Sequence, residues 1–412
     1  AHGALENSRV LSEDVGALAE ILAERDYETA AFIGARVMDD STGIGRGFSI
    51  FDLPKGRQRD RQHPVERRAD AVTDSALSWS LARHFAAKPF LLWVHYYDPH
   101  GPYEAREQRI PPEAVEPLVR RHAEFAGLGP EQLAETAAIW HGYDNELAYM
   151  DDQLGRLLHG LRQRKMLDDA VVVVIGDHGE GLMEHGEKSH GATLFQELML
   201  VPLIIVLPDG AGAGTRVQAV VQMQDLLPTL LDLLGLPEEG GGLPGVNLAP
   251  ALRQGAEHDD RPVFFERPYY TPEGLRSQRA LAHGWGFGEM AGVVVGDDKL
   301  IRLPPDAVTG AVAHQLFDLS ADPDELTDVS ARHPDTVARL SALLDDWLAR
   351  YPVDAAAEPP VLSPEREEDL RRLGYIEGPR PPQPQPEPHS PRPSAPDGPP
   401  AAAPEDGQAG RH

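Results

Sequence analysis

The chain has 412 residues, which is long enough to bury a large core and to form two or three domains. Its formal net charge of −28 argues against a nucleic-acid partner, because phosphate binding requires basic patches. The absence of cysteine excludes disulfides, cysteine nucleophiles and thiolate metal sites. No apolar stretch is long enough to span a bilayer.

The first 252 residues alternate between predicted helices and predicted strands. The pattern predicts helices at Ser12–Arg25, Ser75–Ala87, Pro130–Lys165 and Leu226–Leu234, and strands at Thr29–Ile33, Phe90–Tyr97, Val171–Ile175 and Pro202–Leu207. The last two strands are unbroken apolar runs, which are typical of strands buried on both faces. This alternation predicts an α/β domain whose mainly parallel sheet is covered by helices.

The pattern changes after the glycine-rich stretch Gly240–Gly245. Short strands without helices between them are predicted at Val263–Glu266, Val293–Val295, Lys299–Leu303 and Gln315–Leu319, with a closing helix at Pro334–Arg350. We therefore predict a smaller antiparallel sheet subdomain at 253–377. Residues 378–412 are rich in proline and poor in apolar side chains, so we expect a disordered tail.

Polar residues follow two of the predicted buried strands. Asp177 and His178, flanked by glycines, come directly after Val171–Ile175, and His100 lies in a proline-rich turn after Phe90–Tyr97. In parallel α/β sheets ligands bind at the carboxyl ends of the strands, so these side chains are candidates for one site. Carboxylate and imidazole together suit a divalent cation. The alternatives are a solvated or helix-capping Asp177–His178 pair and a buried structural role for His100.

Two further stretches hold polar residues. The loop after His178 contains Glu184, His185, Lys188 and His190, and its acidic residues are better suited to orienting histidines or holding the loop than to nucleophilic attack. The stretch 39–42, Asp-Asp-Ser-Thr, is typical of a capped surface turn.

Several stretches, in order, resemble the bacterial sulfatase family of the alkaline phosphatase superfamily, from about His2 to Ile376. They are Asp98-Pro99-His100-Gly101-Pro102-Tyr103, Gly176-Asp177-His178-Gly179-Glu180, His185-Gly186, His190-Gly191-x-Thr193-Leu194-Phe195-x-Glu197, Val201-Pro202-Leu203, residues 225–231, residues 316–325 and Leu373-Gly374-Tyr375-Ile376.

The resemblance implies a metal-dependent hydrolase of sulfate esters. It implies that Asp177 and His178 bind one divalent cation (calcium, manganese or zinc), with a second metal open, and that His100 and His190 contact the transferred group. Lys188 is a lower-ranked alternative for substrate binding. The expected substrate is a small-molecule or glycan sulfate or phosphate ester, and the expected location is extracytoplasmic.

The resemblance leaves other functional hypotheses open. A phosphodiesterase, a phosphonate monoester hydrolase or a phosphoglycerol-type transferase of the same superfamily is one alternative, and a non-catalytic remnant of the fold is another. The stretch that carries the nucleophile in family members has no counterpart between Ala1 and His412. We therefore expect the chain to be N-terminally incomplete and to have impaired or no activity by itself.

Overall fold

The computed structural model describes residues 10–12, 15–54, 65–83, 88–103, 108–208, 210–217, 220–240, 242–254, 261–270, 288–306, 308–351 and 362–373. The chain divides into two compact units, Ala1–Gly378 and Pro379–His412, and every described residue belongs to the first. The predicted disordered tail at 378–412 lies outside the described residues. Within the described ranges, we find no helix with the length and apolarity that crossing a membrane requires.

A parallel sheet of three strands, in the order β2–β1–β3, forms the first layer of the fold. Its strands are β1 (Glu28–Ile33), β2 (Ile50–Asp52) and β3 (Phe90–His95). Ala31 in the central strand pairs with Phe51 on one side and with Trp93 on the other. β1 is buried along most of its length, as its unbroken apolar run predicts.

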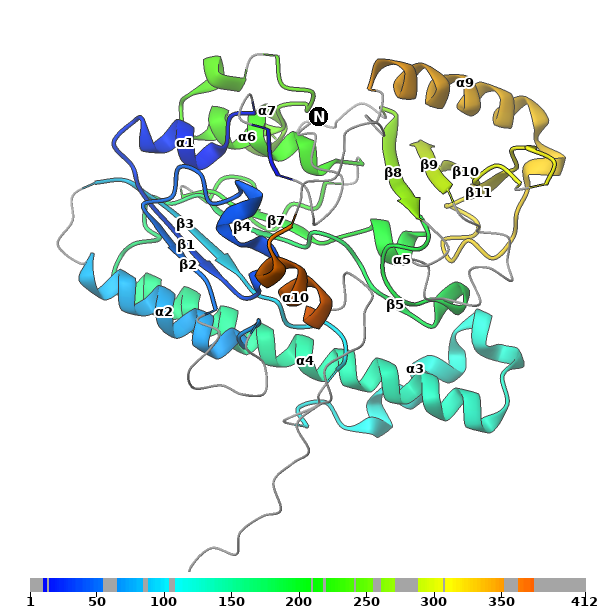
Figure 1. Cartoon of the computed structure of the whole chain (residues 1–412), viewed down its shortest axis with the longest axis horizontal. Coiled ribbons are helices and arrows are strands. Elements are labelled where there is room, and N and C mark those ends of the chain that lie inside the picture. Colours follow the sequence, from blue (N-terminus) through cyan, green and yellow to red (C-terminus); the bar gives the residue numbers. More distant parts are fainter. Residues whose placement is uncertain are drawn as a thin grey trace, which may run out of the picture. The chain divides into compact units, whose positions relative to one another are not determined.

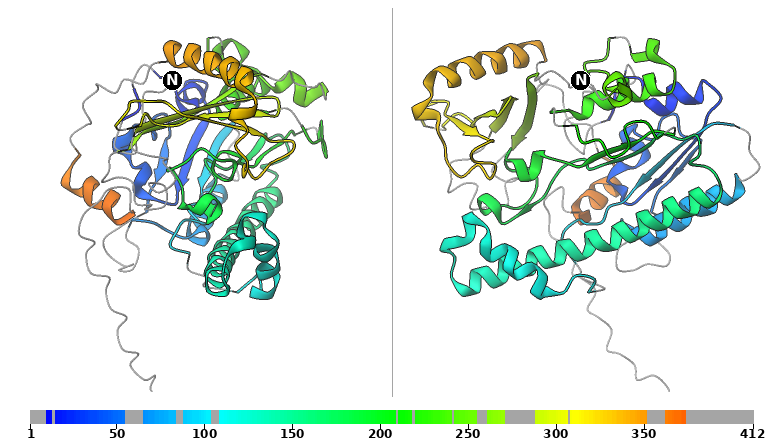
Figure 2. Two further views of the ribbon diagram at one scale, coloured as in Figure 1. Left: turned by 90° about the vertical axis from the view of Figure 1, so that its right-hand side faces the viewer. Right: turned by 180° about the vertical axis from the view of Figure 1, so that it is seen from behind.

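Helices cover both faces of this sheet. On one face α2 (Ala69–Ala82) and the long α4 (Pro130–Gln163) run side by side, and α1 (Leu18–Ala23) lies across the sheet from them (Figures 1 and 2). Phe32 of β1, Trp79 of α2 and Leu157 of α4 share one buried cluster. Each such side chain contributes about 1.5–3 kcal/mol when fully buried.

Two predicted helices begin elsewhere. α1 starts at Leu18 rather than at Ser12, because Glu20 accepts a hydrogen bond from the amide of Ala17 and closes the first turn there. α2 starts six residues before the predicted Ser75. The Asp98 carboxylate accepts a hydrogen bond of 2.9 Å from the Ala69 amide, so a residue beyond β3 caps this helix. A cap so distant in sequence leaves no local signal.

The strands β4 (Val172–Ile175) and β7 (Leu203–Val206) form a separate pair, and the pair is antiparallel. An apolar run does not encode strand direction, and the loop between the two strands reverses the chain. The predicted burial on both faces is wrong, since Ile204 is 56% exposed and Val206 is 52% exposed. The α/β class itself is confirmed, with a parallel sheet, covering helices and a separate antiparallel sheet.

A separate antiparallel sheet has four strands in the order β11–β10–β9–β8. Its elements are β8 (Val263–Tyr270), β9 (Gly288–Val295), β10 (Asp298–Arg302), β11 (His314–Asp318) and the covering helix α9 (Pro334–Arg350). Leu340 and Leu344 of α9 pack on Val293 and Leu300 in a buried cluster. As predicted, Val293 and the β4 strand lie in different sheets.

Shorter elements connect these layers. They are α3 (Pro112–Arg121), β5 (Gly181–Leu182), β6 (Lys188–Ser189), α5 (Gln196–Met199), α6 (Leu226–Leu233), α7 (Ala249–Gln254) and α10 (Pro364–Leu373), with the 3-10 helices η1 (Arg36–Met38), η2 (Asp40–Thr42), η3 (Ala123–Gly127), η4 (Glu184–Gly186), η5 (Met223–Asp225), η6 (Pro237–Gly240) and η7 (Ser330–Arg332).

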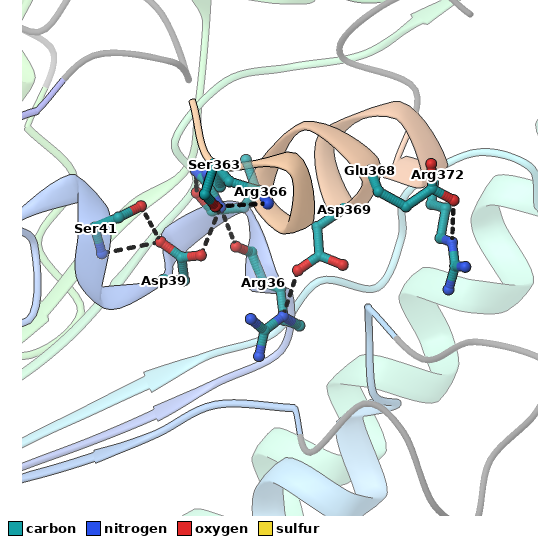
Figure 3. A network of polar contacts seen from close by, with 9 residues as sticks. Arg36, Asp39, Ser41, Ser363, Arg366, Glu368, Asp369 and Arg372 are labelled. Atoms are coloured by element: carbon teal, nitrogen blue, oxygen red, sulfur yellow. Dashed lines mark hydrogen bonds and ion pairs between the residues drawn. The ribbon is translucent and has the colours of Figure 1, made fainter. Parts of the chain in front are cut away.

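The last described helix, α10, packs against the α/β layer just after β1 (Figure 3). Arg366, which is 4% exposed, donates to the carbonyls of Arg36 and Val37 and pairs with Asp39. Arg36 in turn pairs with Asp369 at 2.6 Å. The predicted subdomain at 253–377 remains a prediction, but its last helix makes these contacts outside that range.

The stretch 39–42 is the capped turn that its sequence predicts. One oxygen of Asp39 accepts a hydrogen bond of 3.0 Å from the amide of Ser41, at the start of η2. The same carboxylate faces Arg366 of α10 (Figure 3). This acidic stretch therefore holds α10 in place.

Candidate functional site

The carboxyl ends of β3 and β4 bring three predicted histidines together. The ring centroids of His178 and His190 are 4.2 Å apart, and those of His100 and His190 are 5.5 Å apart. His100 follows β3, His178 follows β4, and His190 ends the loop beyond it. The structure thus places these residues within reach of one small ligand, although up to 90 positions separate them in the chain.

Asp177 and His178 present their donor atoms toward solvent. The Asp177 carboxylate is 75% exposed and the His178 side chain 41% exposed. Nδ1 of His178 lies 2.8 Å from the Gly179 carbonyl, which only accepts, so Nδ1 carries the proton and Nε2 keeps its lone pair in the neutral ring. Gly179 permits this turn, since a Cβ there would meet the Glu197 carbonyl at 1.9 Å.

His190 rests on a buried carboxylate. Its Nδ1 lies 3.3 Å from both oxygens of Glu180, whose side chain is only 7% exposed. Burial, followed by the charge of Glu180, raises the pKa of Tyr103, so this phenol stays protonated and donates a hydrogen bond to the same carboxylate. Glu180 therefore fixes the orientation of the His190 ring through Nδ1, and Nε2 of His190 is directed away from this contact.

His100 is held by stacking. Its ring lies 4.3 Å from that of Tyr97 at an interplanar angle of 19°, and its Nδ1 is 2.9 Å from the Gly101 carbonyl. Tyr97 also packs in the cluster that contains Leu370 of α10. Burial, together with repulsion from His190, lowers the pKa of His100, so its ring is neutral at neutral pH.

His95, the last residue of β3, lies behind these groups. Its Nδ1 accepts a hydrogen bond of 3.2 Å from the Gly34 amide. Burial lowers the pKa of His95 to about 4, although the charge of Asp177 opposes that shift. This histidine is a neutral structural residue, which agrees with its position inside a predicted strand.

Lys188, the alternative substrate-binding residue, is not gathered into the cluster. It lies in β6, its side chain is exposed, and its ammonium makes no hydrogen bond or ion pair with any described residue.

The sequence does not predict the contacts of Tyr97 with His100 or of Tyr103 with Glu180. The position of both tyrosines beside the proline-rich turn is the one feature of the sequence that indicates a role for them.

The donor set for a cation is partial in the described part of the chain. Asp177 Oδ2 lies 3.8 Å from His178 Nε2, a span that one ion with ligand distances of about 2.0–2.3 Å can bridge. The residue types fit a divalent cation. The described ranges contain no group of three or more histidine or acidic residues arranged to hold a metal ion.

Comparison with known proteins gives a consistent picture of the first part of the chain. Residues 2–236, more than half of the chain, match the family described as Sulfatase. Arylsulfatase K of Gallus gallus is 33% identical over 205 residues, and that of Bos taurus is 30% identical over 211 residues. These matches cover 50% and 51% of this chain but only 36% of each relative, so the chain spans little more than a third of them.

Solved structures share the fold over most of this chain. BT4656, determined in complex with its substrate D-glucosamine-2-N,6-O-disulfate, superposes with a TM-score of 0.65 at 20% identity, covering 87% of this chain and 86% of its own. The phosphonate monoester hydrolase of Agrobacterium radiobacter superposes with a TM-score of 0.61 at 21% identity, covering 85% and 83%. At these identities the likeness shows the fold alone.

Proposed function

Because this chain belongs to the sulfatase family, we propose that it is a metal-dependent hydrolase of sulfate esters. The observation that carries the proposal is the convergence of His100, His178 and His190 beside Asp177. Sulfate-ester hydrolysis requires groups that neutralise the sulfate oxygens and a proton for the leaving oxygen. The cluster offers cation ligands and imidazoles for both tasks.

Asp177 and His178 would hold the cation through Oδ2 and Nε2. Carboxylate and imidazole ligands leave calcium, manganese and zinc open, and a second metal near the other histidines is also compatible. When bound, a divalent cation supplies positive charge to the sulfate oxygens and lowers the pKa of a coordinated nucleophile.

His190 and His100 would contact the sulfate group and the leaving oxygen. Glu180 accepts a hydrogen bond from Nδ1 of His190, so the opposite nitrogen of the ring can accept or return a proton at the substrate. His100 is neutral, with its Nδ1 proton directed to Gly101, and its Nε2 can accept a hydrogen bond from substrate. Lys188 is a weaker candidate because its exposed side chain makes no hydrogen bond or ion pair with a described residue.

The proposal includes low activity for the 412-residue chain alone. In the described ranges, no serine or threonine hydroxyl hydrogen-bonds to Asp177, His178 or His190. Two protein ligands also bind an ion weakly. A nucleophile and further ligands from outside the described residues would complete the site.

Two other functions remain as alternatives. The three clustered histidines are compatible with a second metal, which suits phosphate diester or phosphonate ester cleavage, or transfer of a phosphoglycerol group, on the same scaffold. A non-catalytic, ester-binding protein is the other alternative. As substrate we propose a sulfated small molecule or glycan, and as location an extracytoplasmic compartment.

The test is an activity assay of the 412-residue chain and, if its gene encodes residues ahead of Ala1, of a longer form that includes them. Both are offered aryl sulfate, phosphate diester and phosphonate ester with added calcium, manganese or zinc. We expect metal-dependent sulfate release by the longer form and little by the shorter one. Inactivity of both forms on all three substrates would favour the binding protein, and preference for a phosphorus ester would favour the second alternative.

A further inference from the structure

The segment that carries Lys188 and His190, residues 181–190, is called the site loop below. Three of its non-glycine residues have left-handed backbone: Met183 at φ 90°, His185 at φ 48° and Ser189 at φ 130°. Side chains with a Cβ avoid this region, so such a conformation persists only where the surroundings hold it. Some contact outside the loop must therefore maintain the path that delivers His190 to the site.

Trp140 of α4 makes one such outside contact by donating from Nε1 to the Leu182 carbonyl at 2.7 Å, and His185 makes another. Its Nδ1 lies 2.9 Å from Oε1 of Glu197, its Nε2 lies 3.3 Å from the carbonyl oxygen of Glu325, and its ring stacks on Phe195 at 3.7 Å. The side chain is only 11% exposed. Two of these partners come from the segment around α5, and the third comes from the turn after β11.

Glu325, in the turn after β11, is itself paired with a residue of the four-stranded sheet β8–β11, here called the C-terminal sheet. One of its oxygens pairs with Lys299 of β10 at 2.7 Å, and both side chains are fully buried. The other oxygen accepts a hydrogen bond of 2.6 Å from the Gln196 amide, and Lys299 also donates to the Gln196 side chain at 3.2 Å. β10, the turn after β11 and the start of α5 are thereby joined in one buried polar network.

We propose that His185 is a positioning residue that ties the site loop to the C-terminal sheet, and that it does so as an imidazolium. Its relevance to catalysis rests on the proposed function, because the loop carries His190. Both acceptors, the Glu197 carboxylate and the Glu325 carbonyl, lack protons, so only a ring protonated on both nitrogens donates to both. Loss of one proton leaves a nitrogen lone pair facing an oxygen lone pair.

The charges around His185 favour the protonated ring. Burial lowers the pKa of His185, but the hydrogen bond and charge of Glu197, the charge of Glu124 in η3 and the Glu325 carbonyl together raise it above its ordinary value. Lys299 faces the network from β10 and is paired with Glu325. A group whose pKa rises on folding stabilises fully below the unfolded pKa, about 6.5 here, and loses that contribution as pH rises through the folded pKa.

Hydrogen exchange of the full 412-residue chain tests the proposal without any need for turnover. The reporters are loop amides with internal acceptors: Met183 to the Glu187 carbonyl at 2.7 Å, Gly186 to that of Met183 at 3.0 Å, and Glu187 to that of Glu184 at 2.8 Å. After correction for the intrinsic pH dependence of exchange, their protection should fall as pH rises through the His185 pKa. Peptides from β9 and β10 should stay protected.

Three variants sharpen the measurement. His185→Gln should accelerate exchange of the loop by about 10-fold or more at every pH. Glu197→Gln keeps an acceptor but removes the charge, so it should preserve protection at low pH and move its loss to lower pH. His314→Gln, in a half-buried histidine of β11 that lies near Arg302 and Asp345, is the matched control and should change nothing in the loop.

Unchanged loop exchange in His185→Gln, or an unchanged midpoint in Glu197→Gln, would overturn the proposal. If His185→Gln folds poorly by circular dichroism, the pH series of wild type and Glu197→Gln still decides. The results also distinguish a failure of this proposal from a failure of the proposed function. An inactive longer form with a normally protected loop contradicts only the proposed function, whereas an active one with unaltered exchange in the variants contradicts only the role of His185.

Discussion

At the end of β4 the Asp177 carboxylate is 75% exposed and His178 is 41% exposed, whereas His190 is 20% exposed and the Glu180 carboxylate beneath it is 7% exposed. Among the residues that the structure describes, the hydrogen bonds of the first pair go to its own backbone neighbours, through the His178 amide and the Gly179 carbonyl. We call this pair the ligand half of the site, and His100, His190 and Glu180 the histidine half.

The histidine half is held by two tyrosines, which link it to other parts of the chain. Tyr97 stacks on His100 and packs beside α10, while Tyr103 donates to Glu180. Such prior ordering lowers the cost of positioning acid and base groups at a substrate. The ligand half lacks comparable support among the described residues, so its geometry should depend on what binds there.

The largest effect is expected from Asp177→Ala in the ligand half. Residues that only support a metal ligand are commonly worth about 10–100-fold in affinity, so loss of a ligand should cost more than about 100-fold. Isothermal titration of calcium, manganese and zinc into the 412-residue chain measures it. Asp169→Ala, which removes an exposed carboxylate just before β4, is the matched control. Equal cation affinity of the two variants would place the metal elsewhere.

The buried His95, behind the two halves of the site, should make the folded chain less stable in acid. Folding lowers the pKa of His95 to about 4, so between about pH 6.5 and pH 4 the unfolded chain binds more protons than the folded chain. Stability should therefore fall as pH drops through this window, by about 3 kcal/mol at pH 4.

Urea unfolding at pH 7 and pH 4.5, with chelator present, measures the acid effect. His95→Asn keeps an acceptor for the Gly34 amide but does not titrate, so its stability should change less between the two pH values. If wild type and His95→Asn lose the same stability in acid, another group is responsible for the acid sensitivity.

In the histidine half, Glu180→Gln should lower kcat of the active form by about 10-fold or more and leave KM nearly unchanged. Glutamine can still contact His190, but it lacks the charge that stabilises a protonated imidazole during turnover. Steady-state kinetics on aryl sulfate measure the change. Asp144→Asn alters a carboxylate of α4 near His141 and serves as the control. A fall in the control equal to that of Glu180→Gln would indicate a general effect of lost charge.

The sequence predicts which site residues lie at the ends of strands. An apolar run followed by Gly-Asp-His-Gly places Asp177 and His178 at a carboxyl edge, and the same reasoning places His100. The α/β class and the separate antiparallel sheet were predictable for a similar reason, because helix and strand periods differ. The roles of these residues remain predictions.

Tertiary contacts account for what the sequence did not predict. The direction of β7 depends on the path of the site loop, whose left-handed residues Met183, His185 and Ser189 carry no local signature. The start of α2 depends on a carboxylate beyond β3, at Asp98. The buried Lys299 looks like a surface residue in sequence, and only its pairing with Glu325 explains its burial.

The smallest effect is expected from removing residues 379–412. This segment contains no Leu, Ile, Val, Met, Phe, Tyr or Trp, so it has almost no apolar surface to offset the entropy of ordering it. Deleting it should leave the melting temperature within about 1 °C of that of the full chain by calorimetry.

A longer deletion from residue 362 is the contrast, because it also removes α10. Leu370 is fully buried in the cluster that includes Tyr97, and burial of one leucine contributes about 1.5–3 kcal/mol. At roughly 2–4 °C per kcal/mol, the loss of Leu370 alone should lower the melting temperature by several degrees. The stacking of Tyr97 on His100 should loosen as well, whereas the ligand half should bind cations as before. Equal melting temperatures for the two deletions would mean that α10 does not support the histidine half, and a large drop for the shorter one would mean that the tail packs on the fold.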